Sequence, residues 1–207
     1  MLMCTRKILK NKNKLEQQQT MKKKYKLLTD DTIKVGEHTL YRIEALRDFA
    51  DVKAGDKGGY VEFDDNLSHD GTCWVYDNAK VYDIAKVFGG AKVYGNARVY
   101  GYARVYDYAQ VYDNAKVYDI AKVFGGAKVW GNVKVHGFAW VGDHAAVYGS
   151  SQVYENAEVF EYAIVHGEAK IKGKAQILGL SEVCGTAIIQ GETVVKGYRY
   201  IEDGIIE

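Results

Sequence analysis

The sequence predicts an all-β protein, a single-stranded parallel β-helix of about seven 18-residue coils behind a small N-terminal β cap. The main observation is a six-residue unit that repeats 21 times from Val75 to Tyr200, with no insertion or deletion. Its first position is Val or Ile in every copy, and its fifth is Ala in 16. Repeats this short bury their apolar side only against neighbouring repeats, so they predict a stacked architecture.

Each unit is expected to be a short strand followed by a corner, as in residues 111–116 (VYDNAK). A β-branched residue at the first position suits a half-buried strand. The third position is Gly in 13 units and Asp in six, and both tolerate the positive φ of tight corners. Ala at the fifth position fits where the coil is narrow, since a larger side chain would overpack the core.

Three units close a coil of 18 residues, so residues 18 apart lie above one another. Val87, Val105 and Val123 should therefore stack inside one face. At roughly 4.8 Å per coil the seven coils give a prism about 34 Å long. A helix is excluded because a period of six matches neither 3.5 nor 3.6 residues per turn. Residues 75–92 and 111–128 are identical, which indicates that coils have been duplicated.

The residues before the repeat divide into an arm and a cap. Residues 1–23 form a basic, polar arm that we expect to be disordered, and Met21 is an alternative start. Residues 24–74 form the β cap. Residues 39–45 alternate at strand period, and Gly36 with Glu37 indicates a hairpin with Ile33 and Val35. Such a cap would cover the unpaired backbone groups at the end of a β-helix.

Residues 201–207 follow the repeat as a short apolar tail without helical pattern. The tail is expected to fold over the last coil as a cap or to pair with another chain as an assembly strand. Arg199 occupies a fifth position and is expected to point inward.

The outward second and sixth positions carry the candidate binding residues, which the 18-residue spacing arranges in columns. We expect one face to present an aromatic and a basic column that together bind a partner: Tyr76, Tyr94, Tyr112 and Trp130, with Lys80, Arg98, Lys116 and Lys134. Tyr and Arg are favoured at protein interfaces. Aromatic platforms among basic residues also bind single-stranded nucleic acid, but the neighbouring aspartates weaken that interpretation. A third possibility is that the rings only stack on one another and stabilise the fold.

The repeat pattern resembles the left-handed parallel β-helix of the hexapeptide-repeat superfamily over residues 75–200. Residues 48–79 are similar to the entry segment of YdcK-type proteins, described as acyltransferases by inference from fold, and of related proteins in gut bacteria and their phages. The superfamily includes acyltransferases, γ-type carbonic anhydrases, ice binders and inert scaffolds, so the resemblance is specific for fold and weak for function.

The resemblance to acyltransferases implies trimers with a catalytic His near a loop that protrudes from the coils. No such loop interrupts the 21 units, and His136 and His166 occupy second positions where the aromatic columns run. A carbonic-anhydrase zinc site would need three converging His, whereas His136, His144 and His166 lie on three different faces. Cys73 and Cys184 have no His nearby in sequence and are expected to be passive. We therefore predict no catalytic residue, no cofactor and no metal.

Composition limits the location of the protein. No stretch approaches 18 apolar residues, and residues 1–20 lack the apolar core of a secretory signal, so neither a membrane nor export is expected. Three cysteines far apart in sequence indicate a reducing compartment, taken as the bacterial cytoplasm, or the host cytoplasm for a phage protein.

These observations favour a non-enzymatic binding protein or scaffold that acts through a rigid β-helix surface. Its partner is expected to be a protein, and it could itself form a dimer or trimer. The resemblance to phage proteins implies an inhibitor of a host protein or defence complex. The alternative is a hexapeptide-repeat acyltransferase that uses acetyl-coenzyme A.

Overall fold

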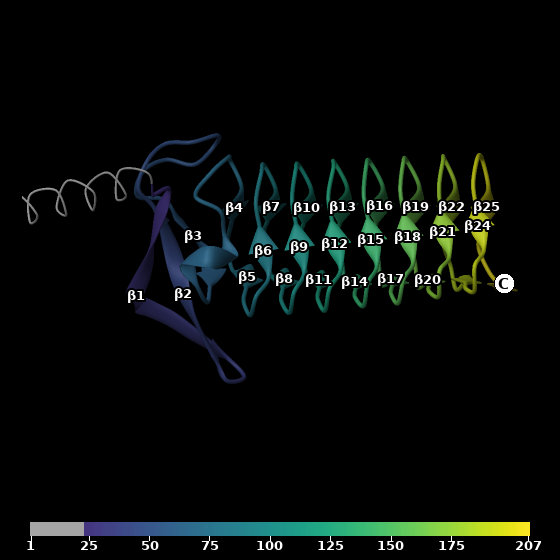
Figure 1. The fold of residues 1–207 in the computed structure, drawn as a ribbon, viewed down its shortest axis with the longest axis horizontal. Coiled ribbons are helices and arrows are strands. Elements are labelled where there is room, and N and C mark those ends of the chain that lie inside the picture. Colours follow the sequence, from purple (N-terminus) through teal and green to yellow (C-terminus); the bar gives the residue numbers. More distant parts are fainter. Residues whose placement is uncertain (1–22) are drawn as a thin grey trace, which may run out of the picture.

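The computed structural model describes residues 23–207, which form a parallel β-solenoid with an antiparallel sheet at its N-terminal end (Figure 1). The predicted all-β fold class is confirmed, with about eight turns where seven coils were expected. The basic arm predicted for residues 1–23 lies almost entirely outside the described residues. No described helix is long and apolar enough to cross a lipid bilayer.

The N-terminal sheet consists of three strands and is continuous with the solenoid. Its strands are Tyr25–Val35 (β1), His38–Ala45 (β2) and Lys57–Val61 (β3), followed by the 3₁₀ turn Asp64–Asn66 (η1). β1 and β2 form the predicted hairpin, in which Val35 pairs with His38 and Gly36 has a φ of 59°. β3 is antiparallel to β2 on one side and parallel to β5 on the other, so the cap covers the first coil through backbone pairing.

The solenoid has three faces, which we name after their first solenoid strand. The β4 face contains Trp74–Val75 (β4), Lys92–Val93 (β7), Gln110–Val111 (β10), Lys128–Val129 (β13), Ala146–Val147 (β16), Ile164–Val165 (β19), Glu182–Val183 (β22) and Tyr200–Ile201 (β25). The β5 face contains Lys80–Val81 (β5), Arg98–Val99 (β8), Lys116–Val117 (β11), Lys134–Val135 (β14), Gln152–Val153 (β17), Lys170–Ile171 (β20), Ile188–Ile189 (β23) and Ile205–Ile206 (β26). The β6 face contains Lys86–Val87 (β6), Arg104–Val105 (β9), Lys122–Val123 (β12), Trp140–Val141 (β15), Glu158–Val159 (β18), Gln176–Ile177 (β21) and Val194–Val195 (β24).

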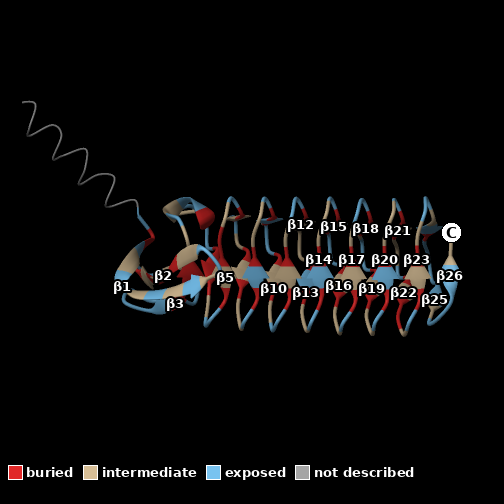
Figure 2. Ribbon diagram, turned by 90° about the horizontal axis from the view of Figure 1, so that it is seen from below, coloured by how far each residue is buried: buried red, intermediate tan, exposed pale blue. Residues whose placement is uncertain are grey.

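Each strand consists of the sixth residue of one unit and the first residue of the next. The sixth residue points outward, while the Val or Ile that follows it is buried in every unit up to Val195. Parallel pairing joins Val87, Val105 and Val123 on the β6 face, as predicted. Figure 2 shows the resulting alternation of buried and outward residues along the rod.

The corners confirm the reason for Gly and Asp at the third position. All 21 third positions have positive φ, including the eight that carry an acid. Each of these acids accepts a hydrogen bond from the backbone N–H of the third residue one coil further on, as Asp119 does from Gly137 at 3.0 Å. The carboxylate therefore accepts a hydrogen bond from a backbone N–H group that has no partner in the strand ladder.

The C-terminal tail pairs within its own chain. β25 pairs with β22, and β26 pairs with β23, so residues 201–206 extend the β4 and β5 faces by one more strand each. The expectation that Arg199 points inward is wrong. Arg199 is exposed because its corner lies at the end of the rod, where no further coil encloses it.

Candidate partner-binding surface

The aromatic and the basic column, which were predicted to lie on one face, lie on two different faces of the solenoid. Tyr76, Tyr94, Tyr112 and Trp130 directly follow strands of the β4 face, whereas Lys80, Arg98, Lys116 and Lys134 are strand residues of the β5 face. The turn closed by the hydrogen bond from Ala79 N–H to Tyr76 O separates them. The prediction failed because each strand begins with the sixth residue of a unit and ends with the first residue of the next unit. A second-position ring therefore lies on the same face as the sixth-position residue of the preceding unit, and the sixth-position residue of its own unit lies on the next face.

The second-position rings form stacks on all three faces, and on the β6 face Gly142 interrupts the stack after Phe124. On the β4 face, the ring centroids of Tyr94 and Tyr112 lie 4.7 Å apart with nearly parallel planes. On the β5 face, Tyr82, Tyr100, Tyr118, His136 and Tyr154 stack at 4.7 to 5.1 Å. Burial within this stack raises the pKa of the Tyr100 hydroxyl to about 12. These rings therefore stabilise the coils, and only their edges are available to a partner.

Most outward cations of the early coils have no anionic partner. Among residues 23–207, the only ion pairs made by the basic strand residues of β5 to β14 are Lys86 with Asp65 and Lys92 with Asp51. The aspartates that follow the strands bind backbone N–H groups of the next coil instead. The β5 face thus presents Lys80, Arg98, Lys116 and Lys134 in successive coils without neutralisation.

A row of exposed apolar residues lies at the corner between the β5 and β6 faces. It consists of the fourth-position residues of four successive coils: Ile84, Tyr102, Ile120 and Phe138, which are 55%, 60%, 42% and 57% exposed. A shallow groove runs beside it, lined by the first three of these residues and by Lys86, Arg104 and Lys122. We call Ile84, Tyr102, Ile120 and Phe138 the corner row.

Our prediction from the sequence overlooked the corner row. The signal was present, because these four residues are 18 apart and occupy a position that most other units fill with Gly, Asn or another polar residue. The predicted binding columns used only the second and sixth positions, where strands were expected. A corner residue in a solenoid is more exposed than a strand residue, so apolar corners are the more informative feature.

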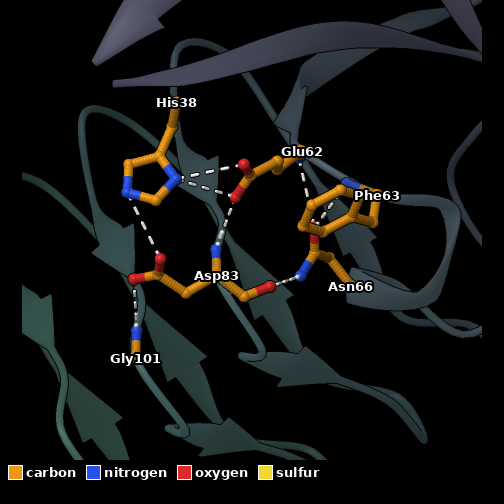
Figure 3. A network of polar contacts seen from close by, with 6 residues as sticks. All are labelled: His38, Glu62, Phe63, Asn66, Asp83 and Gly101. Atoms are coloured by element: carbon orange, nitrogen blue, oxygen red, sulfur yellow. Dashed lines mark hydrogen bonds and ion pairs between the residues drawn. The ribbon is translucent and has the colours of Figure 1, made fainter. Parts of the chain in front are cut away.

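The cap is fixed to the first coil by a polar network around His38 (Figure 3). His38 Nδ1 lies 3.0 Å from Glu62 Oε1, and its Nε2 lies 3.3 Å from Asp83 Oδ1. Glu62 also accepts from the N–H of Asp83, and Asp83 accepts from the N–H of Gly101. His38, Glu62 and Asp83 have the composition of a metal site, but both carboxylates and both ring nitrogens already have partners. The network is therefore a junction between β2, the end of β3 and the first two coils.

The histidines fit the aromatic stacks better than an acyltransferase site. His136 stacks between Tyr118 and Tyr154, and burial lowers its pKa. His166 stacks on Tyr148 at 4.7 Å. Between β4 and β25 the described chain continues from corner to strand without a protruding loop. Both histidines thus continue the aromatic columns, as predicted from their second positions.

Both described cysteines have polar neighbours that are distant in sequence. Cys73 is fully buried and accepts a hydrogen bond from the ammonium of the buried Lys24 at 3.2 Å. Burial raises the pKa of the Cys73 thiol and lowers that of Lys24. Cys184 lies beside His166 and Glu182. His166 and Cys184 are 18 residues apart at second positions, so the column rule could have found this pair.

The repeat geometry agrees with the comparison to known families. Residues 91–107 match the model of the YdcK beta solenoid repeat. This match lies in coils with the continuous parallel ladders described above, so the chain is a β-solenoid repeat protein that resembles YdcK. A comparison with curated proteins found no match. The YdcK-type repeat accounts for the backbone and leaves the role of the outward side chains open.

Proposed function

We propose that this YdcK-type solenoid is a non-enzymatic binding protein or scaffold whose first four coils bind an acidic face of a partner protein. The observation that carries the proposal is the corner row, which places exposed Ile84, Tyr102, Ile120 and Phe138 in successive coils between two columns of cations. Lys80, Arg98, Lys116 and Lys134 lie on one side of the row, and Lys86, Arg104 and Lys122 on the other.

A protein partner suits this combination better than a nucleic acid. Apolar side chains at the centre of a patch with basic residues around them are typical of protein interfaces. Single-stranded nucleic acid is bound by the faces of successive aromatic rings. In the second-position columns those faces are covered by the rings of neighbouring coils. In the corner row the exposed rings of Tyr102 and Phe138 alternate with isoleucines, so they do not form a continuous aromatic platform. The unpaired cations favour an acidic partner because they supply complementary charge along the full row.

The solenoid backbone favours recognition by a preformed surface. Each coil is held by backbone hydrogen bonds to the next, so the row would lose little conformational freedom on binding. An inhibitor of a host protein, the role that the resemblance to phage proteins implies, would act by occupying its target in this way. The stacked Tyr76 column lies around the next corner and is outside the proposed surface.

The test begins with a partner captured on the immobilised protein from a lysate and then purified. Its affinity for three variants would be measured by calorimetry. The corner-row variant Ile84→Ser with Ile120→Ser and Phe138→Ser, and the β5-face variant Lys80→Glu with Arg98→Glu and Lys116→Glu, should each weaken binding by about 30-fold or more, the loss expected for hot-spot residues. The control Lys170→Glu with Lys172→Glu, on the same face in later coils, should bind normally.

Normal binding by the corner-row variant would contradict the proposal. So would complete loss of binding on truncation of residues 201–207 while both N-terminal variants bind, because the C-terminal end would then be the working surface. Circular dichroism and thermal melting would verify that each variant is folded, since exposed charges contribute little to stability.

A further inference from the structure

The β4 face changes its chemistry at the C-terminal end of the rod. Its second-position residues are rings from Tyr76 to His166, and the next two are Cys184 and Glu202. The outward strand residues beside them are Lys92, Gln110 and Lys128 in the early coils, then the apolar Ala146 and Ile164, and finally Glu182 and Tyr200. Three side chains with different ligand atoms therefore meet within two successive coils.

The geometry of these side chains is compact. One ligand atom each from His166, Glu182 and Cys184 lies within 4.8 Å of the other two. His166 Nε2 is 2.9 Å from Glu182 Oε1. Cys184 is only 4% exposed, whereas the side chains of His166 and Glu182 are 25% and 40% exposed. The thiol thus lies at the base of a site that is open to solvent on the side of the imidazole and the carboxylate.

A stacking role does not account for this set. His166 continues the aromatic stack through its contact with Tyr148 and forms an ion pair with Glu182. Those contacts leave the choice of Cys184 unexplained, because a thiol neither stacks nor neutralises a charge. A thiol in the outward column is a feature that the other coils of this face do not share.

We propose that His166, Glu182 and Cys184 bind one Zn²⁺ ion, independently of the partner-binding surface. A thiolate, an imidazole and a carboxylate are the three side-chain ligands that zinc takes in proteins. A thiolate ligand disfavours Mg²⁺ and Ca²⁺, which require oxygen ligands. Parallel backbone ladders fix all three residues, so the site needs only a small opening of the His166–Glu182 contact to admit the ion. Water would complete the tetrahedron.

Binding would exchange a proton for the metal. The Cys184 S–H bond breaks, its proton is released to solvent, and the thiolate forms the bond to zinc. The Nε2 proton of His166, which faces Glu182 Oε1, passes to solvent while Nδ1 holds or takes up the one proton of the neutral ring, and the freed Nε2 lone pair binds zinc. Affinity for zinc should therefore fall as the pH is lowered, because protons compete for the thiolate and the imidazole.

The experiment uses the full chain with Co²⁺ as a spectroscopic probe and Zn²⁺ as a competitor. One equivalent of Co²⁺ should produce the near-ultraviolet absorption of a cobalt–thiolate bond, and Zn²⁺ should abolish it. Cys184→Ser should remove this absorption. His166→Phe keeps a ring in the stack, and Glu182→Gln keeps the shape of the side chain; each should weaken Zn²⁺ binding by more than about 10-fold.

The matched control is His136→Phe, which replaces a stacked histidine that has no cysteine beside it. It should bind the metal like the unaltered protein. Absence of a stoichiometric cobalt–thiolate absorption would overturn the proposal. Persistence of that absorption in Cys184→Ser would also overturn it, because Cys4 or Cys73 would then be the ligand.

Discussion

The early and the late coils of the solenoid share one backbone and differ in almost everything they present outward. The outward strand residue is Lys or Arg in nine of the ten strands from β5 to β14, and in only one of the eleven from β15 to β25. The inward residue is Val or Ile in both groups. The repeat thus determines the buried side chains, whereas the outward side chains vary independently of it. A function assigned from the repeat alone would therefore apply equally to two chemically different surfaces.

The largest effect should come from placing a charge in the shared interior. Val117 and Val165 are both fully buried, one in the early and one in the late coils. Val117→Asp and Val165→Asp should each lower the free energy of unfolding by roughly 4 kcal/mol or more, because an unpaired carboxylate is buried. Chemical denaturation would measure the loss. A much milder effect in one half would show that the two interiors are not equivalent.

A smaller effect should distinguish the middle of the rod from its end. Gly101 and Gly173 have φ of 68° and 72°, and an added Cβ would meet backbone atoms of the next coil at 3.0 and 2.8 Å. Gly191 has a φ of 70° and nothing within 4 Å of such a Cβ. Gly191→Ala should cost about 1 to 2 kcal/mol for the backbone conformation alone.

Gly101→Ala and Gly173→Ala should cost similar amounts to each other and more than Gly191→Ala, since the next coil must also move. Thermal melting would rank the three variants. Equal losses in all three would mean that contact between coils contributes nothing at the corners, and that conformation alone selects glycine there.

The smallest effect concerns pH and should separate the two ends. The hydrogen bond to Glu62 raises the pKa of His38 above its ordinary value of 6.5, so the network favours the protonated imidazole. Its stabilisation is fully present below about pH 6.5 and is lost as the pH rises through the higher pKa of the folded state. Hydrogen exchange, corrected for its intrinsic pH dependence, should show the amides of Asp83 and Gly101 losing protection over that range.

Two comparisons test this assignment. The amide of Gly173, which is bonded to Glu155 in the late coils, should keep its protection. His38→Gln should remove the pH dependence at Asp83 and Gly101. If that variant retains the same pH profile, another group controls the junction.

The sequence was sufficient for the periodic part of the molecule and insufficient for the rest. Val117 could be placed inside and Asp119 at a corner because every unit repeats the same steric demand. Tyr76 and Lys80 were wrongly predicted to lie on the same face of the solenoid, because the period alone does not show at which residue of a unit a strand begins. The 18-residue spacing contained the pair of His166 and Cys184, which was nevertheless overlooked. The contact of His38 with Glu62 could not be predicted, because the cap has no repeat to fix its register.

The corner carboxylates have one more consequence, which concerns the length of the rod. Seven of the eight acids bind the N–H of a glycine one coil further on, and in the early coils of each corner acid and glycine alternate. Insertion of a single coil would bring two acids or two glycines together, whereas insertion of two coils preserves the alternation. The identical segments 75–92 and 111–128 are two coils apart. The rod can thus be lengthened in increments of two coils, about 9.6 Å each, without changing the contacts at any corner.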